Sequence, residues 1–409
     1  MEVLSEEIIT KKIKGSIVTP RGFSAAGTNA GLRYSKNDVG MIASSVPASS
    51  AAVYTLNVFQ AAPIKVTQDS LSTNGLLQGV VVNSACANAC TGEKGLKDAY
   101  EMRNKAAEKL GVEEDLFAVA STGVIGEFLP LDKVINGIEA LKLNSQIENA
   151  EDFQNAILTT DTGIKGCCYQ AEIDGVTVYM GGAAKGSGMI HPNMATMLGF
   201  VTTDVKIEPE YLQSALKQVT NFTFNQITVD GDTSTNDMVI VMANGEAHNQ
   251  SLTPDHPDWS VFLELLTLTC ESLAKQIAKD GEGATKLVEV LVDGAKDNED
   301  ARMVAKQIVG SNLVKTAIFG SDANWGRIIC AVGQSQATVN PDTVNIAIGS
   351  HVMLKNSEPQ NFNEEEVRAY LDGDFIQIFV DLQNGIGSSK AWGCDLSYDY
   401  VKINASYRT

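Results

Sequence analysis

The chain has 409 residues, 44% of them hydrophobic, and carries 31 basic against 50 acidic side chains, a formal net charge of −19. This length allows two or three structural units with a large buried core. The acidic balance and the lack of a clustered basic patch argue against binding to a nucleic-acid backbone. The first twenty residues hold no apolar block of signal-peptide length, and no later window has about eighteen uncharged apolar residues. We therefore expect a soluble, cytoplasmic protein.

Strand-like and helix-like stretches alternate in the N-terminal half. Short apolar runs predict strands at 79–85 and 117–120, and helical periodicity predicts helices over 94–110 and 131–143. Gly111 follows the first of these helices as a C-terminal glycine, and Pro130 suits the first turn of the second.

The second half continues the alternation after a β-branched apolar run that ends near residue 205. Helices are predicted over 208–221, 259–279, 298–309 and 364–371. Apolar runs predict strands at 238–243, 287–292, 316–319, 328–332, 344–348 and 376–382. We find no internal repeat or low-complexity linker. The sequence thus predicts an α/β fold of layered mixed β-sheets flanked by helices.

A glycine-rich segment from Lys185 to Phe200 contains Thr196. A threonine becomes a good nucleophile when it is the first residue of a chain, because its own α-amine then acts as the base. Here that requires cleavage between Ala195 and Thr196, for which the glycines provide the backbone freedom that an N-to-O acyl shift needs. Composition by itself favours the simpler interpretation, a loop that enters a strand.

Other motifs are equally open to two interpretations. The turn at Ser121-Thr-Gly123 either presents amides as an oxyanion hole or is an ordinary end of a strand. The acidic loop from Asp230 to Asp237 lacks the glutamate that would complete a calcium loop, so a polar loop bordering the site is the better interpretation. The seven cysteines lack metal-ligand spacing, and His191 precedes a proline and is interpreted as structural. No phosphate-binding loop is present, and we predict no metal.

Together with the glycine-rich segment, motifs along the whole chain resemble the ornithine acetyltransferase family, also called glutamate N-acetyltransferase, of arginine biosynthesis. These motifs are Thr19-Pro-Arg-Gly-Phe-Ser-Ala-Ala-Gly27, Ala87-Asn-Ala-Cys-Thr-Gly92, Ser121-Thr-Gly-Val-Ile-Gly126, Thr159-Thr-Asp-Thr162, Asp230-Gly-Asp-Thr-Ser-Thr-Asn-Asp237, Asp280-Gly-Glu-Gly-Ala-Thr285, Gly320-Ser-Asp-Ala-Asn-Trp-Gly-Arg327 and the segment from Trp392 to Asn404.

The resemblance implies an enzyme that cleaves itself between Ala195 and Thr196, giving an α chain of residues 1–195 and a β chain of residues 196–409 within one folded core. Thr196 would then carry the acetyl group from N-acetylornithine to glutamate, with Thr122 and Gly123 as the oxyanion hole. The positions that match the substrate-binding residues of that family are Thr159, Lys185, Thr196, Glu282, Asn404 and Thr409.

The side chains suit amino-acid substrates. Lys185 can pair with an α-carboxylate or stabilise the charge of the active site, and either Glu282 or the C-terminal carboxylate of Thr409 can pair with an ammonium group. Some members of the family also use acetyl-CoA as a donor; we expect no resident cofactor. The resemblance implies a heterotetramer of two α and two β chains. Two alternatives remain at this point. An N-terminal-nucleophile amidase or aminopeptidase would transfer the acyl group to water, and a non-enzymatic binding protein would keep its chain intact.

Overall fold

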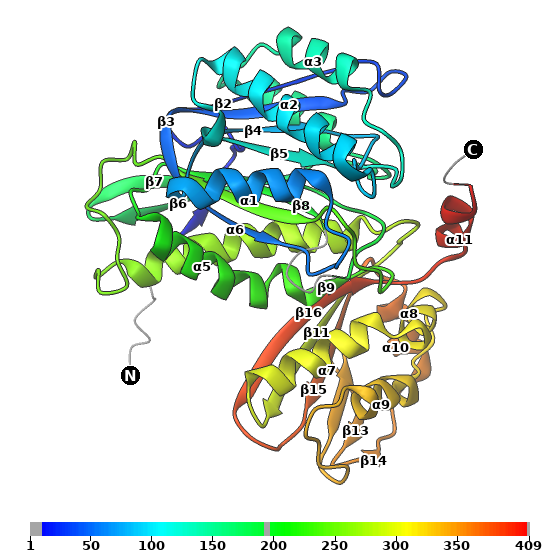
Figure 1. Ribbon diagram of the computed structural model, residues 1–409. Coiled ribbons are helices and arrows are strands. Elements are labelled where there is room, and N and C mark those ends of the chain that lie inside the picture. The colour runs from blue at the N-terminus through cyan, green and yellow to red at the C-terminus, as the bar shows by residue number, and fades with distance from the viewer. Residues whose placement is uncertain (1–9, 192–196, 407–409) are drawn as a thin grey trace.

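The computed structural model describes residues 10–191 and 197–406. Two β-sheets, each with helices packed against it, build the molecule (Figure 1). No helix in the described ranges has both the length and the apolarity needed to span a bilayer.

The larger sheet has nine strands within these ranges, in the order β1-β6-β7-β8-β10-β3-β4-β5 with β2 paired to β3. They are β1 (Lys11–Lys12), β2 (Phe23–Thr28), β3 (Val39–Tyr54), β4 (Leu76–Asn83), β5 (Phe117–Ser121), β6 (Lys165–Ile173), β7 (Val176–Lys185), β8 (Leu198–Thr203) and β10 (Met238–Ala243). β3 joins two parts of this sheet. Its C-terminal half pairs with β10, its N-terminal half pairs with β2 and β4, and the register with β4 shifts between Ala43 and Ala48.

The smaller sheet has seven strands in the described part of the chain, in the order β14-β13-β12-β15-β11-β16-β9. They are β9 (Ile227–Thr228), β11 (Leu287–Ala295), β12 (Asn345–Ile348), β13 (His351–Lys355), β14 (Glu358–Pro359), β15 (Phe375–Asp381) and β16 (Gly387–Cys394). β11 lies between β15, to which it is parallel, and β16, to which it is antiparallel.

Helices cover both sheets, as Figure 1 shows. They are α1 (Ala62–Asn74), α2 (Gly92–Leu110), α3 (Leu131–Ala140), α4 (Ile147–Ile157), α5 (Pro209–Phe222), α6 (Trp259–Lys279), α7 (Asn298–Gly310), α8 (Asn312–Phe319), α9 (Trp325–Gln334), α10 (Glu364–Leu371) and α11 (Tyr398–Ala405), with 3-10 turns η1 (Glu114–Leu116) and η2 (Phe224–Gln226). α11 projects from the side of the molecule (Figure 1) and has no buried residue.

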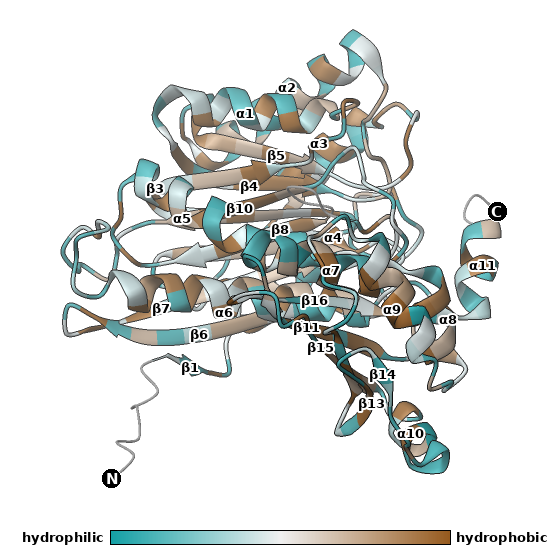
Figure 2. Cartoon of the chain, turned by 90° about the horizontal axis from the view of Figure 1, so that it is seen from below, coloured by the Kyte–Doolittle hydropathy of each residue, from teal (hydrophilic) through white to brown (hydrophobic). Residues whose placement is uncertain are grey.

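The strand β10 shows why the interior is built as it is. All six of its residues are buried, because alternate side chains enter two different cores. Val239 and Val241 pack in the core formed with α5 and α6, whereas Ile240 lies in the core on the opposite face. Figure 2 shows brown, apolar strands within the molecule and teal on the outer helices.

The structure confirms the predicted fold class of layered mixed sheets flanked by helices. The predicted helices correspond to α2, α3, α5, α6, α7 and α10, and most predicted strands to β4, β5, β8, β10, β11, β12 and β15. Gly111 ends α2 in the left-handed region at φ 73°. Pro130 lies one position before α3 instead of in its first turn. Since β7 pairs with β8, strands on both sides of position 195/196 belong to one sheet.

Two predicted strands were wrong. Residues 316–319 belong to α8 and residues 328–332 to α9. Short apolar runs do not separate a strand from one turn of a buried helix. In α9, Ile328, Ala331 and Val332 are buried at helical spacing, and Ser311 caps α8 by accepting a hydrogen bond from the Val314 amide.

Candidate active site

A cavity of about 340 Å³ opens where β5 and β7 end and where β8 and β10 begin. Its wall includes six of the residues predicted from the sequence to form the site, which come from distant parts of the chain. They are Thr122, Gly123, Thr159, Lys185, Glu282 and Asn404. Three further predicted positions, Ala195, Thr196 and Thr409, lie outside the described residues. Met197, the residue bonded to Thr196, lines the same cavity.

The turn after β5 is held in a conformation that requires glycine. Gly123 has φ 133°, and a Cβ there would overlap the Ala85 carbonyl group. The flanking amides are bonded, Thr122 N to Asn83 O at 3.0 Å and Val124 N to Ala85 O at 3.0 Å. Within the described residues the Gly123 amide has no hydrogen-bond acceptor, and Gly123 lines the cavity. An amide in that state is suited to stabilise an oxyanion.

Lys185 ends β7 and brings a positive charge to the cavity. Only 8% of the residue is exposed, and its Nζ donates to Thr122 Oγ1 at 3.4 Å. A buried ammonium group beside the glycine turn attracts a carboxylate or a developing negative charge.

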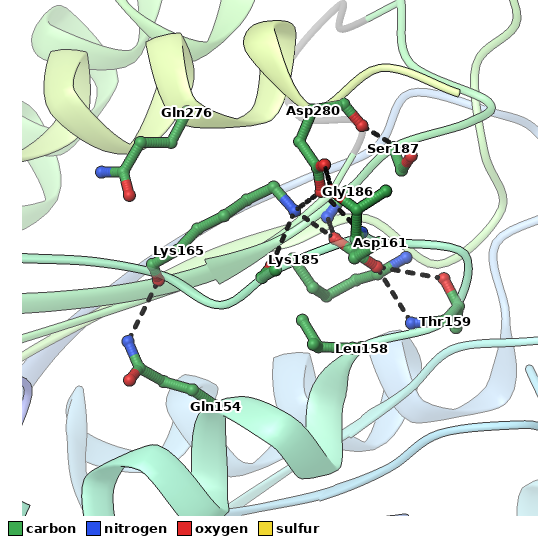
Figure 3. A network of polar contacts seen from close by, with 12 residues as sticks. Gln154, Leu158, Thr159, Asp161, Lys165, Lys185, Gly186, Ser187, Gln276 and Asp280 are labelled. Atoms are coloured by element: carbon green, nitrogen blue, oxygen red, sulfur yellow. Dashed lines mark hydrogen bonds and ion pairs between the residues drawn. The ribbon is translucent and has the colours of Figure 1, made fainter. Parts of the chain in front are cut away.

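A network centred on Asp161 fixes two edges of the cavity (Figure 3). The Asp161 carboxylate accepts hydrogen bonds from Thr159 N at 2.9 Å and from Gly186 N at 2.7 Å. It also receives the Lys165 ammonium at 2.6 Å. Burial raises the pKa of Asp161, but the Lys185 and Lys165 charges outweigh burial and hold that pKa below its usual range. Asp161 is therefore an ionised, buried anchor for the loop after α4 and for the end of β7.

The same network reaches the acidic side of the cavity. Lys165 Nζ bonds Asp280 Oδ2 at 2.5 Å, and Asp280 O accepts from Ser187 Oγ at 2.7 Å. The Glu282 amide then donates to Ser187 O at 3.0 Å. Glu282 is 7% exposed as a residue, and its carboxylate accepts a hydrogen bond from Asn404 Nδ2 at 2.7 Å. A buried carboxylate held in this way suits a cationic group of a ligand.

Two residues of the site were missed by the sequence reasoning, which treated 230–237 as a bordering polar loop. Asn236 and Asp237 both line the cavity. Asn236 Nδ2 donates to Ala87 O at 2.6 Å and to Ser121 O at 2.9 Å, which ties this loop to the glycine turn. Asp161 belongs to the motif Thr159–Thr162, but the sequence predicted no role for it. These three residues lie in polar motifs, and that position was the one indication of a role in the site. The spacing of the residues does not indicate which side chains point inward.

The motif residues Asp230 and His191 have other partners. Asp230 accepts hydrogen bonds from Met189 N at 2.6 Å and Ile190 N at 2.9 Å, so it holds the glycine-rich segment. His191 Nδ1 lies 3.0 Å from Thr228 Oγ1. Burial, aided by the Lys306 charge, lowers the pKa of His191 to about 4, so its ring is neutral at pH 7. The prediction of a structural histidine fits these contacts.

Comparison with known proteins gives the site its context. Residues 24–409 match the sequence pattern of the ArgJ family. The chain belongs to the ArgJ family. It is 65% identical over 401 residues to the arginine biosynthesis bifunctional protein ArgJ of Geobacillus stearothermophilus, with 98% of each chain covered. It is 61% identical over 406 residues to the protein of the same name in Bacillus subtilis, with 99% of each covered.

A solved ArgJ structure from Bacillus halodurans is also similar, with 65% identity and a TM-score of 0.51. The match covers 100% of that chain but 52% of this one. The family resemblance predicted from the sequence motifs is thereby confirmed. The roles assigned to individual site residues stay predictions, which the cavity geometry makes specific.

Proposed function

We propose that this ArgJ-family chain is an acetyltransferase of arginine biosynthesis, which moves the acetyl group of N-acetylornithine to glutamate through an acetyl ester on Thr196. One observation carries the proposal. A single cavity joins Met197, the buried Lys185, the buried Glu282 and the Gly123 amide, which has no acceptor among the described residues. The relatives named as arginine biosynthesis bifunctional proteins agree over nearly the whole chain.

Cleavage before Thr196 would create the nucleophile. The freed α-amine would take the proton from Thr196 Oγ as that oxygen attacks the acetyl carbon. One observation supports a cut here, and a second is compatible with it. A fragment 196–409 has 409 − 195 = 214 residues, or 52% of the chain, and 52% is the share that the solved Bacillus halodurans chain covers when matched over its full length. The paired strands β7 and β8 would also keep the two fragments in one fold.

The charges of the cavity suit the two substrates. Both carry an α-carboxylate, for which the Lys185 ammonium is the buried partner, while Glu282 is available to the side-chain ammonium of the ornithine part. The tetrahedral intermediate would direct its oxyanion toward the Gly123 amide and the Thr122 hydroxyl. Thr159 and Asn404 complete the wall of the cavity, and we place the C-terminal Thr409 with them as a further substrate contact.

Denaturing electrophoresis and acetyl-transfer assays test this proposal. Wild-type protein should give two fragments, 1–195 and 196–409. Without glutamate it should release at most one ornithine per enzyme molecule from N-acetylornithine, and repeated turnover should require glutamate. Thr196→Ala should give one band at the 43.7 kDa of the intact chain and no transfer. A fully active Thr196→Ala protein would rule the proposal out. Acetate release without glutamate would indicate instead a hydrolase that transfers the acyl group to water.

Donor choice and assembly complete the proposal. Glutamate acetylation with acetyl-CoA as the sole donor would show whether CoA serves as a co-substrate. We also propose a heterotetramer of two α and two β chains in the cytoplasm, with no nucleic-acid or membrane partner. Light scattering coupled to size-exclusion chromatography should give about twice the mass of one cleaved pair, and a single pair in solution would contradict the heterotetramer.

A further inference from the structure

Asp237 has an unusual position in the cavity. The residue comes directly before β10 and is 5% exposed, yet it lines the cavity wall. Its backbone is fixed on both sides, because Thr55 N donates to Asp237 O at 3.0 Å and Met238 N donates to Met197 O at 2.9 Å. The backbone at Asp237 is therefore fixed, and the residue lines the same cavity as Met197, which follows Thr196 in the sequence.

One oxygen of this carboxyl group has no hydrogen-bond partner. Asp237 Oδ2 is buried without an acceptor or donor among the described residues, although buried polar atoms are nearly always paired. Burial raises the pKa of Asp237 well above its usual range, and the Lys185 charge opposes burial only in part. In its protonated form a carboxyl group is a hydrogen-bond donor, and the raised pKa favours that form.

We propose that Asp237 is the acid that gives a proton to the amine leaving the donor substrate and takes one back from the attacking amine of the acceptor. The inference rests on the proposed acetyl transfer and adds a step to it. An amide nitrogen is a poor leaving group unless it is protonated as its C–N bond breaks. Among the described residues, the other charged groups that line the cavity are Lys185 on β7 and Glu282 after α6.

The protons balance in each half of the reaction. Thr196 Oγ bonds the acetyl carbon and gives its proton to the threonine α-amine, while the C–N bond breaks and the nitrogen takes the Asp237 proton. Ornithine leaves, and the Asp237 carboxylate remains near the Lys185 charge. In the second half the neutral glutamate amine attacks the ester, Asp237 takes a proton from that nitrogen, and Oγ regains its own. The neutral amine of the released ornithine then takes a proton from water, and the glutamate ammonium loses one proton to water before it attacks.

Two donors separate a proton-transfer role from a structural one. For Asp237→Asn we expect ornithine release from N-acetylornithine to fall by about 10²- to 10⁴-fold. The burst of nitrophenolate from 4-nitrophenyl acetate should keep its wild-type rate, because that leaving group needs no proton. The matched control is Asp232→Asn, at an exposed position of the same loop, and it should match wild type with both donors. Asp237→Glu should recover part of the lost rate.

Several outcomes overturn the inference. An Asp237→Asn protein that keeps its rate with N-acetylornithine does so, and so does one that loses both donors equally. If Asp237→Asn is not cleaved, the pH dependence of the two wild-type reactions tests the role of Asp237. The N-acetylornithine reaction should then lose rate at high pH where the nitrophenyl acetate reaction does not, and coincident profiles refute the role. A wild-type protein without glutamate-dependent ornithine formation refutes the proposed function instead.

Discussion

The Gly186 amide donates to Asp161 Oδ1 over 2.7 Å, which joins the end of β7 to the loop after α4. The same oxygen receives the Lys165 ammonium at 2.6 Å. This buried carboxylate thus connects two cavity segments that lie far apart in the sequence, while the residue itself is absent from the cavity wall. Its effect on catalysis is expected to act through Thr159 and Lys185.

Replacing Asp161 should weaken both the fold and the site. Asp161→Asn preserves the shape but leaves the buried Lys165 with Asp280 as its acidic partner. We expect a loss of about 2–4 kcal/mol in the free energy of unfolding and a fall in kcat/KM of about tenfold or more. Urea unfolding and steady-state kinetics measure the two effects. Asp132→Asn, at an exposed position in α3, is the control, and equal behaviour of the two variants would contradict the anchoring role.

The pKa of Asp161 predicts a dependence of stability on acid. Because the folded-state pKa lies below its ordinary value of 3.8, the carboxylate stabilises the fold above that value. Its contribution is lost as the pH falls through the lower, folded-state pKa. Unfolding free energies measured from pH 6 down to pH 3 should therefore fall less steeply for Asp161→Asn than for wild type. Parallel curves would show that folding does not lower the pKa of Asp161.

The sequence predicted which motifs form the site better than it predicted which carboxylates of those motifs point into the molecule. Residues such as Thr122 and Glu282 belong to motifs that a family shares in order, so resemblance located them before any fold was known. Asp161 and Asp237 lie in equally polar motifs, and only the register of β10 and the path of the loop after α4 show which carboxylates face inward. The false strand at 328–332 has a related cause, since a five-residue apolar run carries too little periodicity to identify α9.

Gly188 predicts a change in substrate binding. A Cβ at this position would overlap the Glu282 carboxylate, so Gly188→Ala should displace that side chain from its place beside Asn404. We expect KM for N-acetylornithine to rise by about tenfold with a smaller change in kcat, because a contact to the substrate cation is lost. Gly163→Ala is the matched control, since a Cβ there has nothing within 4 Å. An unchanged KM would show that Glu282 does not bind the donor.

His191 predicts a second, separate effect of pH on stability. Its folded-state pKa of about 4 lies below the ordinary 6.5, so the unfolded chain binds a proton between these values and the folded chain does not. Stability is therefore complete above pH 6.5 and falls as the pH drops toward 4. Allowing for partial solvent exposure, the loss is about 2 kcal/mol.

Urea unfolding in a Thr196→Ala background keeps the chain intact during the measurement. His191→Asn can still bond Thr228 and should remove most of this slope, whereas His351→Asn, on β13 of the smaller sheet, should keep it. A slope unchanged by His191→Asn would show that the ring is protonated in the fold and would place a charge, instead of a neutral hydrogen-bonding group, at the start of the segment leading to Thr196.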